Sequence, residues 1–175
     1  MNFSIAILLS CLISAPAFAQ TGLEYELPAS AVNWSVKNQL ENENGSMKIF
    51  VPQDSEKNSN EFFGVNVNKF PADLDNTAAF KDGLAAVLPQ MDIDVQVVEK
   101  HQDSVIYEWS AKQEGAEKMH GWGRVFAVKE GTAALCYQTS ELSTLEKSRS
   151  DWMPVLQKAK AVEKIENHDA SNKAA

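Results

Sequence analysis

The segment HGWGR, residues 120–124, gathers the side chains of this sequence that are best suited to chemistry. His120 can act as a base or a metal ligand near neutral pH, and the planar guanidinium of Arg124 can bind a carboxylate. Trp122 is of the residue type that most often anchors a protein interface. We therefore predict a binding site for a ligand or a protein partner at His120, Trp122 and Arg124, with Trp122 exposed and Glu108 as a neighbour.

An enzyme that uses His120 with acidic residues is the alternative, either a hydrolase or a metal-dependent enzyme. The H-G-x-G string is similar to the oxyanion loops of some esterases, but the G-x-S-x-G nucleophile elbow of those enzymes is absent. His101, His120 and His168 have no H-x-x-x-H or H-E-x-x-H spacing, so metal ligands would have to come from distant parts of the chain. Phosphate-binding loops and dinucleotide fingerprints are absent as well. The sequence favours binding without catalysis and without a cofactor.

The residues around HGWGR alternate in size with the period of a β-strand. Small residues occupy one face, and large residues occupy the other: Gly121, Gly123, Val125 and Ala127 against Trp122, Arg124, Phe126 and Val128. Glycines in a row permit a close approach to the strand backbone. We expect the narrow face to lie beneath a helix.

The first 19 residues have the pattern of a secretory signal peptide. An apolar run from Phe3 to Ile13 leads to Ala17-Phe18-Ala19, an A-x-A site that predicts cleavage after Ala19. Leu8-Leu9-Ser10-Cys11 also resembles a bacterial lipobox, so an envelope lipoprotein anchored through Cys11 is a second possibility. The sequence therefore predicts an exported protein, periplasmic or secreted, and no transmembrane segment follows the predicted cleavage site.

Length and charge restrict the remaining function classes. The chain has 175 residues and a net charge of −8, and a single domain over residues 20–165 with a flexible tail over 166–175 is expected. A negative field without a basic cluster disfavours nucleic acid as a partner. After signal cleavage Cys136 is the only cysteine, and its apolar surroundings predict a buried thiol.

The elements that must position these residues follow from periodicity. Strands are expected at residues 34–41, 46–52, 61–70, 94–100, 104–112, 120–128 and 132–139, and residues 20–33 read as a loose lead-in. One helix is expected in residues 74–91, capped by Asn76 or Thr77 and ended by Pro89, and another in residues 146–165, capped by Ser150 or Asp151. This order predicts an α+β fold, an antiparallel sheet of about six to seven strands with both amphipathic helices on one face.

The layout resembles the PsbP-like superfamily over roughly residues 25–165. WSVKNQLENENGSMKIFVP, EFFGVNVNKF, the first helix and the long meander that ends at Trp152 carry the resemblance. It implies a PsbP-like sandwich and a non-catalytic role in binding or assembly, and no family-wide active-site motif accompanies it. The partner, a protein or a small ligand, remains unidentified.

Overall fold

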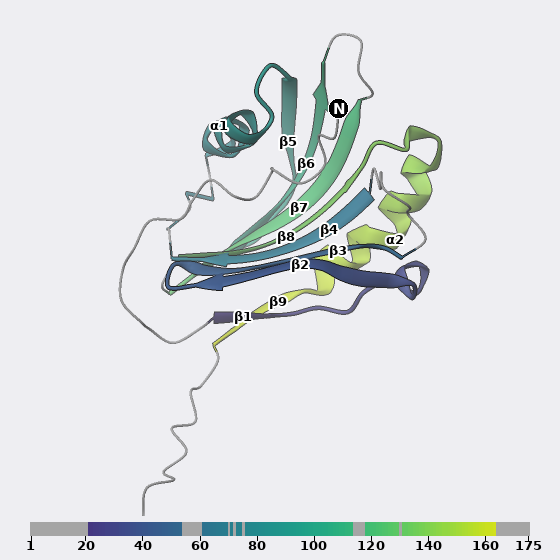
Figure 1. The fold of residues 1–175 in the computed structure, drawn as a ribbon. Helices are drawn as coiled ribbons and strands as arrows, with labels where there is room; N and C mark the ends of the chain where they lie inside the picture. Colours follow the sequence, from purple (N-terminus) through teal and green to yellow (C-terminus); the bar gives the residue numbers. More distant parts are fainter. Residues whose placement is uncertain are drawn as a thin grey trace, which may run out of the picture.

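The computed structural model describes residues 21–53, 61–69, 71, 73, 74, 76–113, 118–129 and 131–163 (Figure 1). The elements in chain order are β1 (Thr21–Glu24), the 3-10 helix η2 (Ala29–Ala31), β2 (Trp34–Asn42), β3 (Gly45–Pro52), β4 (Glu61–Asn68), α1 (Thr77–Val87), β5 (Asp92–Lys100), β6 (Ser104–Lys112), β7 (Met119–Val128), β8 (Gly131–Thr139), the 3-10 helix η3 (Leu142–Thr144), α2 (Leu145–Lys158) and β9 (Lys160–Glu163). The predicted α+β class and the seven-stranded antiparallel sheet are confirmed.

The large sheet has the strand order β2-β3-β4-β8-β7-β6-β5, and β1 and β9 form a separate two-stranded sheet. Every neighbouring pair is antiparallel, and β4 pairs with β8 in the middle, so the two halves of the chain meet there. Short connections join β2 to β3, β5 to β6 and β7 to β8, as the sequence predicts. Gly45 and Gly131 adopt φ values of 155° and 148° at two of these turns, a region that favours glycine.

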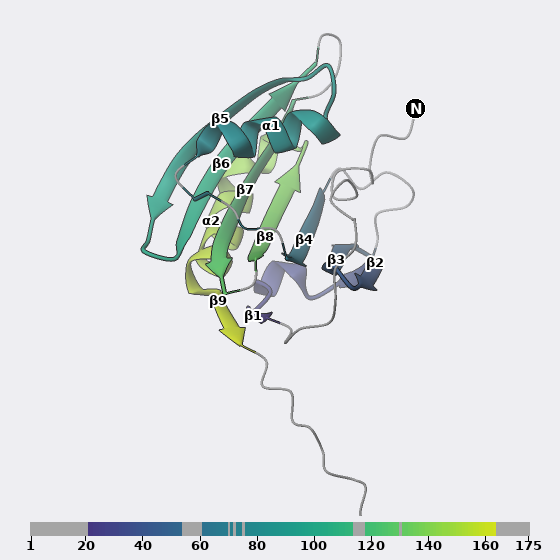
Figure 2. The ribbon, with the colours of Figure 1, turned by 90° about the vertical axis from the view of Figure 1, so that its left-hand side faces the viewer.

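The two helices lie on opposite faces of the large sheet, and the expectation that they share one face is wrong (Figures 1 and 2). α2 covers the face that carries Trp122 and Phe126, whereas α1 packs beside the β5–β6 edge on the other face. The reason is that β5 to β8 carry large apolar side chains on both faces, such as Trp109 on one and Trp122 on the other. Each face therefore needs its own cover.

The face under α2 holds the larger of the cores, which we name the α2 core. Its centre is a row of stacked rings that joins four elements. The ring centroids of Trp122 and Tyr137 are 5.9 Å apart, those of Tyr137 and Trp152 are 4.6 Å apart, and those of Trp152 and Phe63 are 4.8 Å apart. Large aromatic side chains bury much apolar area, and stacked pairs add about 0.5–1.5 kcal/mol each. This row fixes α2 on the sheet.

The opposite face holds a smaller cluster in which Leu84 of α1 and Leu88, the residue after α1, meet Trp109 of β6. The narrow face of β7 belongs to this side. A Cβ atom at Gly121 would lie 2.5 Å from Cε2 of Trp109, so the glycine makes room for an indole ring from the adjacent strand. The close approach predicted from the glycines is present, but a side chain and not a helix makes it.

The ends of α2 differ from the prediction. The helix begins at Leu145, with Thr144 before it, and not at Ser150 or Asp151. Pro154 therefore lies inside the helix rather than in its first turn. The helix ends at Lys158, and residues expected to continue it form β9 instead. Asn76 caps α1 as predicted, because its Oδ1 accepts a hydrogen bond of 3.0 Å from the amide of Ala79.

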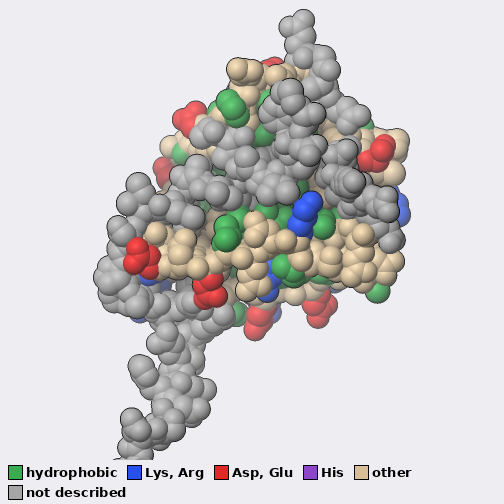
Figure 3. Space-filling view, in the orientation of Figure 1, with side chains coloured by type: hydrophobic (Ala, Val, Ile, Leu, Met, Phe, Trp, Pro, Cys, Tyr) green, Lys and Arg blue, Asp and Glu red, His purple; other side chains and the backbone are tan. Residues whose placement is uncertain are grey.

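Within the described residues, no helix is long and apolar enough to cross a membrane. Acidic side chains are spread over the face shown in Figure 3 rather than gathered in one patch. The predicted signal peptide, with Cys11 and Ala19, and the predicted tail at residues 166–175 lie outside the described residues.

Candidate functional site

The four residues predicted as a site lie together on the α2 side of the sheet. Trp122 of β7 is directly opposite Glu108 of β6, and Arg124 and His120 are its neighbours on the same face. Trp122 is only 1% exposed, so the prediction that it is a surface anchor is wrong. Its indole lies in the α2 core, where it stacks on the ring of Tyr137 with the centroids 5.9 Å apart. A partner in solution therefore meets little of Trp122.

Arg124 is also buried, and it holds the end of α2. Its Nη1 donates hydrogen bonds to the carbonyl oxygens of Leu156, Gln157 and Ala159 at 3.0, 2.8 and 3.2 Å. The last carbonyls of a helix have no donor within the helix, and a cation there is favourable. The guanidinium carbon also lies 4.5 Å from the ring centroid of Phe126. The guanidinium that the sequence predicts to bind a ligand is therefore engaged by carbonyl groups of the protein itself.

His120 and Glu108 keep a little access to solvent, with side chains that are 14% and 13% exposed. His120 Nδ1 lies 3.9 Å from Glu108 Oε1, and Arg149 Nη2 of α2 lies 3.8 Å from Glu108 Oε2. Burial lowers the pKa of His120, while Glu108 acts in the opposite direction and Lys118 reinforces the decrease. At neutral pH the histidine is therefore uncharged, and the ion pair of Glu108 is the one with Arg149.

Among the described residues, His120 Nδ1 is buried without a hydrogen-bond partner. No group of three or more His, Cys, Asp or Glu side chains in the described part of the chain could hold a metal ion. Cys136 is partly buried, and burial raises the pKa of its thiol to about 11, which keeps it protonated and unreactive at neutral pH.

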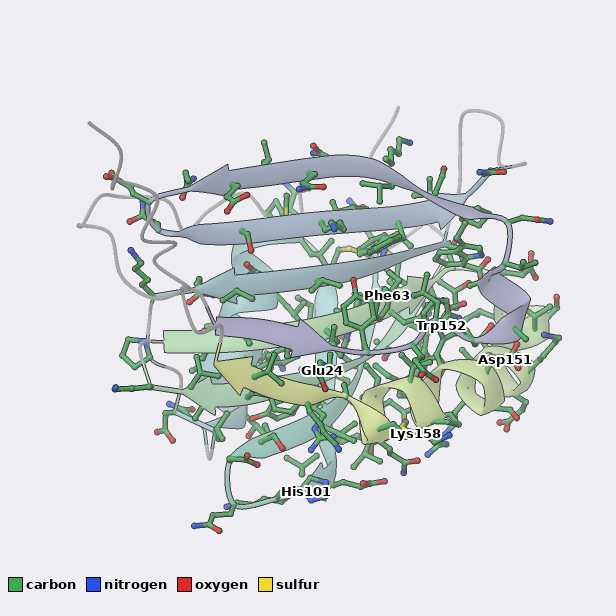
Figure 4. All side chains as sticks on the ribbon, turned by 90° about the horizontal axis from the view of Figure 1, so that it is seen from below. Glu24, Phe63, His101, Asp151, Trp152 and Lys158 are labelled. Carbon is green, nitrogen blue, oxygen red and sulfur yellow. The ribbon has the colours of Figure 1, made fainter. Side chains whose placement is uncertain are left out.

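A groove of about 640 Å³ lies elsewhere, between α2 and residues 23–28 (Figure 4). Its apolar lining comes from Leu23, Tyr25, Leu27, Pro28, Pro154 and Val155. Its charged lining comes from Glu24, Glu26, Asp151, Lys158 and Lys160. Figure 4 shows Glu24 on one side, Asp151 and Lys158 along α2, and Trp152 of α2 next to Phe63 of the sheet. The volume is in the range of small-molecule sites, which is about 300–1,000 Å³.

Alternating side chains build the wall opposite α2. Leu23, Tyr25 and Leu27 pack against the α2 core, whereas Glu24 and Glu26 between them are exposed. The ring centroid of Tyr25 lies 5.6 Å from that of Phe63, and burial raises the pKa of its hydroxyl. This alternation is that of an extended strand with one buried face. The wall is thus anchored to the core through its inward side chains.

Some charged side chains of the groove form ion pairs with other residues, and others do not. Lys147 Nζ lies 2.6 Å from Asp151 Oδ2, and this hydrogen bond, with a smaller contribution from Ser30, lowers the pKa of Asp151. By contrast, Lys158 and Lys160 form no ion pair or hydrogen bond with another described side chain. Two cations are therefore available at the end of the groove where α2 passes into β9.

Sequence reasoning missed this groove because residues 20–33 read as a loose lead-in. The signal that would have found its wall is the string LEYEL, in which apolar and acidic residues alternate at positions 23–27. The other wall could be predicted only if the bounds of α2 were known. The C-terminal end of α2 is held by Arg124, which is distant in the sequence. His120, Trp122, Arg124 and Glu108 are brought together as predicted, but none of them lines the groove.

Comparison of the structure with solved structures identifies the architecture. The solution structure of cyanobacterial PsbP (CyanoP) from Synechocystis sp. PCC 6803 matches 89% of this chain and 99% of its own, with a TM-score of 0.56 and 13% sequence identity. The fold is PsbP-like. LpqN of Mycobacterium tuberculosis, described as involved in cell envelope biogenesis, matches 82% of this chain and 85% of its own, at 7% identity and a TM-score of 0.43. No family model and no curated protein sequence matches the chain. At these identities the PsbP-like likeness concerns the fold alone.

Proposed function

We propose that this PsbP-like protein is an exported, non-catalytic binding or assembly factor that recognises a protein or small ligand. The groove between α2 and residues 23–28 carries the proposal, because it combines an apolar lining with charged groups on both walls. Ligand sites typically have this composition, in which apolar surface supplies affinity and a few polar groups supply orientation. The signal-peptide pattern of residues 1–19 supports export.

The cluster at His120 is the less favoured place for this function. Trp122 and Arg124 are committed to the core and to the end of α2, and only the edges of His120 and Glu108 meet solvent. A ligand there would have to compete with Arg149 for the carboxylate of Glu108. His120 and Glu108 stay candidates for a minor contact, whereas the groove offers volume as well as charge.

Site-specific photo-crosslinking in the cells that make the protein tests the groove. Benzoylphenylalanine replaces Glu26 or Lys158, which are exposed lining residues, and Ala78 on α1 as an exposed control. We expect an adduct of defined mass from both groove positions and not from the control. The adduct formed from position 26 should weaken when Lys158→Glu is added. If the groove positions give no more adduct than Ala78, the groove is not the binding site.

The mature N-terminus tests the export part of the proposal. Intact mass spectrometry of protein purified from the envelope and from the medium should give a chain that begins at Gln20. A chain that begins at a lipidated Cys11 would instead establish the anchored form. An uncleaved chain recovered only from the cytoplasm would contradict export.

A further inference from the structure

We infer that the groove binds an extended peptide segment of a partner protein, which lies between residues 25–27 and α2 and pairs with the backbone of residues 25–27. This inference rests on the proposed function, because it names the kind of molecule that the groove takes. Three observations carry it: the hydrogen-bonding state of the wall, the dimensions of the groove and the position of its charges.

The wall continues β1 beyond the point at which its pairing stops. β1 pairs with β9 from Thr21 to Glu24, and the partner of Glu24 is Lys160, the first residue of β9. Beyond Glu24 the side chains still alternate in and out, but no hydrogen bond joins the backbone of residues 25–27 to another described residue. In an extended chain, successive residues present their N–H and C=O groups to opposite sides. At least one residue of the three therefore presents both groups toward the groove.

A peptide strand in the groove would pair with residues 25–27 in the same way as β9 pairs with β1. The chain itself does not occupy this position, because the residues before β9 form α2. The wall at residues 25–27 thus offers backbone groups to a ligand that itself carries backbone donors and acceptors. A peptide supplies these groups, whereas a fatty acyl chain does not.

The dimensions fit a short stretch of extended chain. The lining residues of α2 run from Asp151 to Lys158, which is roughly 10 Å at a rise of about 1.5 Å per residue. Three to four residues of a strand cover that length at about 3.3 Å each. Leu27, Pro154 and Val155 form the apolar middle, where one side chain of the peptide would be received.

The charges of the groove predict which side chains the peptide carries and in which direction along the groove they follow one another. Lys158 and Lys160 lie at the β9 end and form no ion pair with other described side chains, although Glu24 is the cross-strand neighbour of Lys160. Lys158 is therefore the main group that favours an acidic side chain or a C-terminal carboxylate. Glu26 on the opposite wall favours a basic side chain further along. An apolar residue flanked by an acidic residue on the β9 side is therefore the expected motif.

Selection from a phage-displayed library of random heptapeptides, followed by binding measurements on synthetic peptides, tests the inference. The folded wild-type protein is the bait. The double variant Lys158→Glu/Lys160→Glu is compared with Lys81→Glu/Lys112→Glu, which makes the same charge change at exposed lysines outside the groove. Equal thermal stability of the three proteins is required first.

We expect enriched peptides to carry an acidic residue next to an apolar one and to bind with micromolar Kd by fluorescence anisotropy. The groove variant should weaken binding at least fivefold, and the control variant less than twofold. N-methylation of the central peptide amides should weaken binding at least tenfold, and hydrogen exchange at one or more amides of residues 25–27 should slow in the complex.

Three results would overturn the inference: no enrichment above the groove variant, equal binding of N-methylated peptides, or unchanged amide exchange at residues 25–27. Dodecanoate serves as an amphiphile probe. If it binds in a manner that depends on Lys158 and Lys160 while no peptide does, the groove takes an amphiphile and the peptide is excluded. Such an outcome leaves the proposed binding role of the groove standing, because crosslinking at Glu26 and Lys158 tests that role separately.

Discussion

The guanidinium of Arg124 in β7 donates a hydrogen bond of 2.8 Å to the carbonyl oxygen of Gln157 in α2. With the bonds to Leu156 and Ala159, this contact ends the helix at the place where the chain turns into β9. β9 then pairs with β1, which leads into one wall of the groove. Arg124, which the sequence predicts as a ligand contact, thus affects the groove indirectly, because it caps the C-terminal end of α2.

Replacing Arg124 with methionine should destabilise the fold strongly. The change leaves three carbonyl oxygens near the end of α2 without their donor. A hydrogen bond to a charged group contributes about 1.5–3 kcal/mol in net terms, and the three contributions do not add because all three bonds come from one nitrogen. We expect a loss of roughly 2–4 kcal/mol in the free energy of unfolding, measured by urea denaturation. Arg149→Met, on the exposed side of α2, is the control and should cost less than about 1 kcal/mol. Equal losses in the two variants would remove the capping role of Arg124.

Gly121→Ala should destabilise because its new Cβ would lie 2.5 Å from the indole of Trp109. Overpacking of a well-filled core costs about 1–3 kcal/mol. Adding Trp109→Leu, which frees the space, should make the alanine at position 121 nearly neutral in a double-mutant cycle. Gly83→Ala in α1 is the matched control: nothing lies within 4 Å of its added Cβ, so a gain of about 0.5–1 kcal/mol is expected. A Gly121→Ala variant as stable as wild type would show that the ring moves aside at little cost.

Cys136 should make the protein less stable in alkali. Burial raises the pKa of its thiol from 9.0 to about 11, so between these values the unfolded chain loses a proton that the folded chain retains. Stability therefore falls as pH rises through this window, by about 1.4 kcal/mol at pH 10 for this group. The difference between wild type and Cys136→Ala in urea denaturation at pH 8 and pH 10 isolates the effect from other groups. Parallel pH curves for the two proteins would contradict it.

His120 should titrate below its ordinary pKa of 6.5, because burial disfavours the imidazolium. Glu108 opposes this decrease, so Glu108→Gln should lower the pKa further, as followed by NMR of the imidazole carbon-bound protons. The folded state then binds fewer protons than the unfolded state below pH 6.5, and stability falls as pH drops from there toward the lowered pKa. A pKa of His120 that rises in Glu108→Gln would show that the carboxylate does not stabilise the charged ring.

Local patterns were sufficient to predict most elements. Alternation in SVIYEWSAK and HGWGRVFAV predicted β6 and β7, and Asn76 marked the start of α1, because these signals depend only on neighbouring residues. The helical stripe after Trp152 was predicted to extend too far, because Ala159 and Ala161 favour a helix by intrinsic propensity, whereas residues 160–163 form β9. Arg124, 35 residues before Ala159, supplies the contact that ends the helix.

The sequence by itself determined the α+β class, the PsbP-like order of elements and several hairpin turns, because periodicity and turn residues are local properties. Only the tertiary structure decided that α1 and α2 cover opposite faces, that Trp122 and Arg124 are buried, and that LEYEL becomes the wall of a groove. The positions of the helices and the burial of Trp122 and Arg124 depend on which apolar face of the sheet each helix covers. Residues 23–28 and 151–160 are separated by more than a hundred positions, and only their packing on a common core places them side by side.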